Sequence, residues 1–145
     1  MISAVTDPLL HLRVTGALLA VIAAAHLFVP AHLRWRDELR TLSLVNRQIF
    51  EVHTAFIVLL LVLLSTLLLT MGDALLEATR LSRALLGGLA IFWGLRMLAQ
   101  WFYYSPAIWH GDRFRTVMHY TFSAAWIYMT ATFAAALLHT MHLGR

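Results

Sequence analysis

Cysteine is absent from this 145-residue sequence, and so is lysine, so all 11 basic residues are arginine. Without cysteine the chain can form neither a disulfide nor a thiolate metal site. Charged residues of both signs make up only 12% of the chain, whereas an ordinary soluble domain has about 25%. So few charges cannot cover the surface of a water-soluble protein of this size.

Apolar residues take the place of the missing charge, at 61% of the chain and a mean hydropathy of +0.75. A bilayer core about 30 Å thick needs roughly 20 helical residues. Four stretches reach this length, at about 9–29, 49–71, 84–104 and 117–141. We predict an all-α protein, a single integral membrane domain over 1–145, folded as a four-transmembrane-helix, up-down-up-down bundle.

Two further features refine this expectation. Pro30 is expected to end the first helix, and 34–48 is expected to form an interfacial amphipathic segment. Small residues recur every four positions at Gly16, Ala20 and Ala24, which favours close packing of the first helix against a neighbour.

Arginine counts in the short loops predict the orientation. The loops at 31–48 and 105–116 carry Arg34, Arg36, Arg40, Arg47, Arg113 and Arg115, whereas the other side carries Arg13, Arg80, Arg83 and Arg145. The positive-inside rule then places both termini outside, in a multi-pass protein expected in a bacterial inner membrane. The lipid bilayer is the expected partner, together with other membrane subunits or a homo-oligomer, and nucleic acid is not expected because no basic helix or groove motif occurs.

Polar residues near the spans gather on one side of the membrane, the side assigned to the cytoplasm. They are His26 on the first helix, Asn46, Arg47, Glu51 and His53 on the second, Arg96, Gln100 and Tyr103 on the third, and His119 and Tyr120 on the fourth. Lipid cannot solvate such groups, so polar helix edges turn inward. We therefore expect a polar pocket roughly one to two turns deep.

The histidine cluster suggests a cofactor. No HxxxH or HExxH spacing occurs in it, so a ligand set must come from different helices. His53 with His119 is the first pair expected, and His26 is the third candidate. Two facing imidazoles suit haem b, with Arg96 at the propionates and Gln100 as a further cofactor-binding residue. Glu51, His53 and His119 could instead hold a transition metal.

Arg96 has three expected uses. Its side chain could snorkel past Gln100 toward the tyrosines, pair with Glu51, or hold an anionic ligand group such as a phosphate or a propionate.

The favoured function is therefore a redox-type membrane subunit with a haem or metal cofactor. Two alternatives stay open, a structural or accessory subunit of a membrane complex, and a small enzyme acting on a lipophilic or glutathione-like anionic substrate. Four helices with an Arg-rich first loop resemble the membrane-associated proteins of eicosanoid and glutathione metabolism. Those proteins place an Asn and a Glu three residues apart, whereas Glu51 here follows Asn46 by five.

Overall fold

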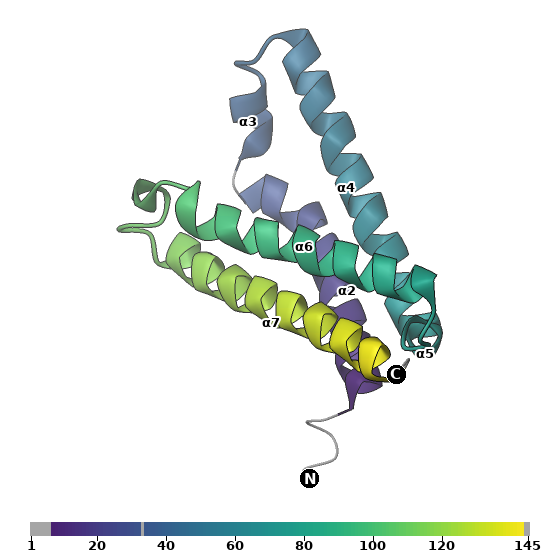
Figure 1. Cartoon of the computed structure of the whole chain (residues 1–145). Helices are drawn as coiled ribbons and strands as arrows, with labels where there is room; N and C mark the ends of the chain where they lie inside the picture. The colour runs from purple at the N-terminus through teal and green to yellow at the C-terminus, as the bar shows by residue number, and fades with distance from the viewer. Residues whose placement is uncertain (1–6, 33, 144–145) are drawn as a thin grey trace. The chain divides into compact units, whose positions relative to one another are not determined.

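The computed structural model describes residues 7–32 and 34–143, except the side chains of 29–32 and 36, and every regular element in this part is helical (Figure 1). The long helices are α2 (Pro8–His32), α4 (Leu44–Thr70), α6 (Arg80–Phe102) and α7 (Arg113–Leu143). The short ones are α3 (Trp35–Leu39), α5 (Gly72–Leu75) and the 3-10 helix η1 (Pro106–Ile108). Each long helix contains a segment long and apolar enough to cross a membrane. The helical class with four spans is confirmed, and the up-down-up-down bundle stays a prediction.

Capping groups, which hydropathy does not detect, move the helix ends away from the expected positions. α4 begins at Leu44 rather than near 49, because the Ser43 hydroxyl accepts a bond from the Asn46 N–H at 3.4 Å. The end of the expected interfacial segment 34–48 therefore belongs to α4. α7 begins at Arg113 rather than 117, where Asp112 Oδ1 accepts from the Arg115 N–H at 3.0 Å.

Proline does not end the first helix as expected. α2 continues to His32, so Pro30 lies within its last turn. A proline lacks one helical donor but has a φ that a helix accepts, so a final turn can continue past it. At the other end Asp7 Oδ1 accepts from the Leu9 N–H at 3.0 Å, and Pro8 occupies the first helical position.

The chain divides into two compact units. The first unit comprises residues up to Leu12 together with α5, α6, η1 and α7, and the second comprises 13–71, which holds the rest of α2 with α3 and α4. The expected single membrane domain stays a prediction.

In the second unit α2 and α4 approach closely at Gly16. The Ser65 hydroxyl donates to the Gly16 carbonyl at 2.8 Å. A Cβ on Gly16 would lie 3.1 Å from the Leu68 Cβ and 3.2 Å from the Ser65 carbonyl oxygen. Close packing is confirmed at this glycine, whereas Ala20 and Ala24 are exposed.

In the first unit α6 and α7 pack side by side and antiparallel (Figure 1). Their buried apolar side chains recur at helical spacing: Leu86 and Trp93 on α6, and Trp126, Met129, Phe133 and Ala136 on α7. At the end away from η1 the Arg83 Nη2 donates to the Thr140 carbonyl at 2.8 Å. His11 also contacts this pair, with its Nδ1 2.9 Å from the Tyr128 hydroxyl.

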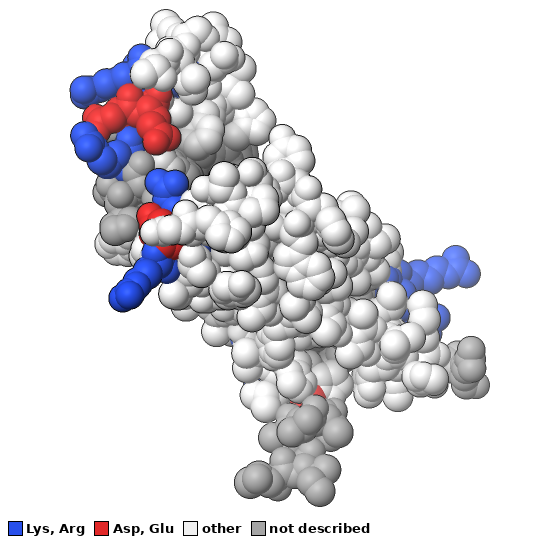
Figure 2. Space-filling model, turned by 90° about the vertical axis from the view of Figure 1, so that its left-hand side faces the viewer, with Lys and Arg blue, Asp and Glu red and all other residues white. Residues whose placement is uncertain are grey.

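Much apolar surface is left open on the long helices. On α4, Phe56 is 66% exposed and Leu63 is 58% exposed. Charged side chains instead form a few groups, such as the Arg34–Asp37 ion pair of 3.0 Å beside α3, and Figure 2 shows wide surfaces with no charged side chain. Acyl chains, rather than water, solvate such surfaces well. The four apolar helices indicate a multi-pass membrane protein in contact with lipid.

Candidate functional site

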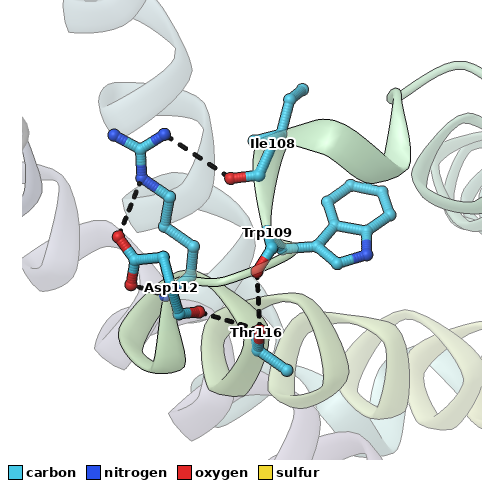
Figure 3. A network of polar contacts seen from close by, with 5 residues as sticks. Ile108, Trp109, Asp112 and Thr116 are labelled. Carbon is cyan, nitrogen blue, oxygen red and sulfur yellow. Dashed lines mark hydrogen bonds and ion pairs between the residues drawn. The ribbon is translucent and has the colours of Figure 1, made fainter.

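The loop between α6 and α7 folds back onto the start of α7 (Figure 3). The Thr116 hydroxyl lies 2.8 Å from the carbonyl oxygens of both Trp109 and Asp112, so its single proton is shared between them. Arg115 adds an ion pair to Asp112 at 3.4 Å and a bond to the Ile108 carbonyl at 3.5 Å. These bonds fix the backbone that carries Trp109.

Trp109 covers His119. The two rings stack with centroids 3.9 Å apart and planes 16° apart. Tyr120 meets the same imidazole edge to face, with centroids 5.5 Å apart. The imidazole is therefore held in place by aromatic contacts from the loop and from its own helix.

A chain of hydrogen bonds joins Arg96, Gln100 and His119. The Arg96 Nη1 donates to the Gln100 Oε1 at 3.2 Å, and the Gln100 Nε2 lies 2.9 Å from the His119 Nδ1. A guanidinium can only donate, so it fixes the oxygen of the amide toward itself and the NH₂ group toward the imidazole. His119 Nδ1 must then accept, which places the ring proton of the neutral imidazole on Nε2.

Aromatic faces surround the Arg96 cation. Its Cζ lies 4.9 Å from the centre of the Trp126 ring and 5.7 Å from that of Tyr104. Trp126 in turn stacks on Trp93, with centroids 5.1 Å apart. The direction toward Gln100 and Tyr104 agrees with the expected snorkelling. No carboxylate forms an ion pair with Arg96 among residues 7–32 and 34–143.

Two buried donors near this cation have no acceptor. Trp93 is 3% exposed and Trp126 is 5% exposed. Within the described part of the chain, neither indole N–H has a hydrogen-bond partner. An unpaired buried donor costs about 1–3 kcal/mol, so these two N–H groups would be stabilised by an added acceptor.

The remaining predicted residues lie on α2, α4 and the end of α6. His26 and His53 each place Nδ1 2.8 Å from the carbonyl four residues earlier, that of Ile22 and that of Ile49. A carbonyl only accepts, so in both rings Nδ1 carries the proton and Nε2 is free to bind a metal.

The structure thus brings together Arg96, Gln100, His119 and Tyr120 of the predicted pocket, all in the first unit. Tyr103 is 83% exposed and packs on Tyr104.

His26, Asn46, Arg47, Glu51 and His53 belong to the second unit, where Asn46 and Glu51 are exposed and Arg47 is half-buried. No group of three His, Asp or Glu suited to a metal occurs among the described residues. Pairing of His53 with His119, and of Glu51 with Arg96, stays a prediction.

Sequence reasoning did not place Trp109 in the site. Trp109 precedes His119 by ten positions, which is not a helical spacing. The residues that could have indicated this folded loop are Pro106 and Gly111, because proline and glycine favour turns. Gly111 has a φ of +85°.

Comparisons with protein families, curated proteins and solved structures were made for the whole chain. None of them finds a match. The side-chain chemistry between α6 and α7 is therefore the basis for the proposed function.

Proposed function

We propose that this protein binds the anionic group of an amphipathic ligand between α6 and α7, with Arg96 as the main contact. The observation that carries the proposal is a membrane-helix arginine bonded to a neutral amide and to aromatic faces, with no carboxylate partner among the described residues. A phosphate or carboxylate offers the planar oxygen pair that a guanidinium fork prefers.

The donor capacity of Arg96 supports an added anion. An arginine near the centre of a bilayer costs about 2.5–3.5 kcal/mol on insertion scales. One cation–π contact returns about 0.5–2 kcal/mol, and a hydrogen bond from a charged donor such as the Arg96 guanidinium returns about 1.5–3 kcal/mol. A guanidinium has five N–H donors, of which Gln100 uses one, so further donors could form charge-assisted bonds to a ligand.

Gln100 and His119 would orient the ligand rather than neutralise it. Their hydrogen bonds hold Arg96 toward the membrane face, and the neutral His119 turns an Nε2–H donor away from the amide. The polar groups offered to a ligand are thus donors: the Arg96 guanidinium, the His119 Nε2–H and both indoles. Such a set selects an acceptor-rich ligand.

The test compares lipid binding by matched arginine variants in neutral detergent. Native mass spectrometry would titrate phosphatidylglycerol and phosphatidylcholine against the wild type, Arg96→Gln and Arg113→Gln. Arg113 is exposed at the same end of the helix pair and controls for general charge. We expect Arg96→Gln to weaken phosphatidylglycerol binding about tenfold or more, since a charge-assisted bond contributes about 1.5–3 kcal/mol. Equal losses in both variants would contradict the proposal.

The variant Glu51→Gln distinguishes ligand binding by Arg96 from an ion pair between Arg96 and Glu51. If Glu51 is the partner of Arg96, removing its charge frees the guanidinium and should strengthen phosphatidylglycerol binding. If the site takes a ligand instead, Glu51→Gln should leave the affinity close to that of the wild type.

A haem b or transition-metal cofactor in a redox-type subunit is the second candidate. It is supported by the imidazoles of His26 and His53, whose Nδ1 protons face backbone carbonyls as in most metal-ligating histidines. His119 differs, because its Nδ1 accepts from Gln100 and its Nε2 must lose a proton before it can bind iron. In the first unit Arg96 would be the group that meets a propionate.

An optical titration with haem tests this candidate. The result expected is a Soret shift at one equivalent that His53→Ala abolishes and His110→Ala leaves intact, because His110 lies in the exposed loop. Loss of the shift in His26→Ala or in His119→Ala would name the second ligand. Absence of any shift in the wild type would exclude haem.

A further inference from the structure

We infer that the ligand between α6 and α7 carries an ester carbonyl group, which accepts hydrogen bonds from the Trp93 and Trp126 indoles while its anionic group meets Arg96. This inference rests on the proposed function and specifies the chemical class of the ligand as an anionic acyl-ester amphiphile. It is carried by the two indole donors, which are almost fully buried and have no acceptor among the described residues.

The depth of Trp93 and Trp126 in the span is the reason why the missing acceptor points to a ligand. Tryptophan in membrane proteins usually lies at the interface, where water accepts its N–H bond. Trp93 and Trp126 instead lie near the middle of α6 and α7. Water does not satisfy polar groups at this depth, so an acceptor must come from protein or from a bound molecule.

A third tryptophan of α6 and α7 has an acceptor for its indole N–H. Trp101 Nε1 donates to the Ser123 hydroxyl at 3.3 Å. Ser123 lies on α7 one turn before Trp126, so this helix pair provides an acceptor for the outer tryptophan but none for the two inner ones.

The positions of Trp93 and Arg96 along α6 also predict the order of the ligand's polar groups along the span. Trp93 precedes Arg96 by three residues, so its Cα lies about 4.5 Å closer to the middle of the span, and the Arg96 Cζ is 4.9 Å from the Trp126 ring. In a glycerophospholipid the ester carbonyls follow the phosphate by one glycerol unit, toward the acyl chains. Phosphate at Arg96 would therefore bring the ester oxygens toward the indoles.

Ester-linked and ether-linked phosphatidylglycerol of equal chain length provide the test, because they share the headgroup and differ only in the carbonyl oxygens. We expect the wild type to bind the ester form about tenfold more tightly, in line with an indole donor gaining its acceptor. Trp126→Phe removes one of the two N–H donors and should reduce the preference. Trp101→Phe is the matched control and should keep it.

A measurement without substitution guards against misfolding of Trp126→Phe. In the wild type labelled with 15N-indole tryptophan, ester-linked lipid should shift the Trp93 or Trp126 N–H resonance, and ether-linked lipid should not. Equal binding of both lipids by the wild type, with both resonances unshifted, would overturn the inference. The proposed function would then still stand if Arg96→Gln weakened both lipids, and it would fall if no variant changed binding.

Discussion

The two ring nitrogens of His119 have different chemical roles, one as acceptor and one as donor. Arg96 determines which nitrogen accepts. Because the guanidinium cannot accept, it orients the Gln100 amide, and the amide makes Nδ1 of His119 an acceptor. In His53 the Ile49 carbonyl makes Nδ1 a donor instead. Two histidines expected to form a pair thus have opposite tautomers, a difference that spacing along a sequence does not encode.

Histidine tautomers are directly measurable by NMR. In protein labelled with 15N-histidine, we expect the neutral His119 ring to carry its proton on Nε2 and the His53 ring to carry it on Nδ1. Gln100→Leu removes the amide donor and should release His119 to a mixture of tautomers, while His53 stays unchanged. Signals assigned by His119→Gln and His53→Gln that show the same tautomer for both rings would refute the hydrogen-bond chain.

At the scale of the helix, hydropathy located the spans but not their ends. The four apolar segments predicted α2, α4, α6 and α7, because span length depends on bilayer thickness alone. Ser43, Asp112 and the continuation past Pro30 shifted the boundaries, because capping bonds are local and do not depend on hydropathy. Helical spacing likewise predicted that Arg96 and Gln100 share one face of their helix. It could not predict the fold of the loop that carries Trp109.

Gly16 and Gly88 provide a matched pair of helix glycines. Gly16→Ala places a Cβ 3.2 Å from the Ser65 backbone oxygen, which cannot move without moving α4, whereas a Cβ on Gly88 meets nothing within 4 Å. We expect Gly16→Ala to lower the free energy of unfolding by about 1–3 kcal/mol. Gly88→Ala should be neutral or raise it by up to about 1 kcal/mol, because alanine favours the helix.

Unfolding in mixed micelles, followed by circular dichroism, measures both glycine variants under one condition. A Gly16→Ala variant as stable as the wild type would show that α2 and α4 do not pack closely at this point.

At the scale of the whole molecule, the structure supports a multi-pass membrane protein and leaves several expectations as predictions. Composition was sufficient for this class, because 12% charged residues cannot cover a protein in water. The bundle arrangement, the orientation, the bacterial inner membrane and an accessory role within a complex depend on packing and on partners outside the chain. The apolar helices, with α4 among them, indicate contact with the lipid bilayer.

Orientation can be tested cleanly because the chain has no cysteine. Asp73→Cys lies between the second and third spans, and Ser105→Cys lies between the third and fourth. The arginine bias predicts that a membrane-impermeant thiol reagent labels Asp73→Cys in intact cells and labels Ser105→Cys only after permeabilisation. The reverse pattern would invert the topology, and labelling of both in intact cells would contradict the number of spans between them.

The proposed contact between Arg96 and an anionic ligand group would produce a dipolar coupling between phosphorus and nitrogen. Protein with 15N-labelled arginine guanidinium groups would be placed in phosphatidylcholine bilayers containing phosphatidylglycerol, and solid-state NMR would measure 31P–15N dephasing of the phosphatidylglycerol signal. We expect dephasing at hydrogen-bonding distance in the wild type and in Arg113→Gln, and its loss in Arg96→Gln. Dephasing that Arg96→Gln leaves unchanged would contradict the proposed contact between Arg96 and the anionic group.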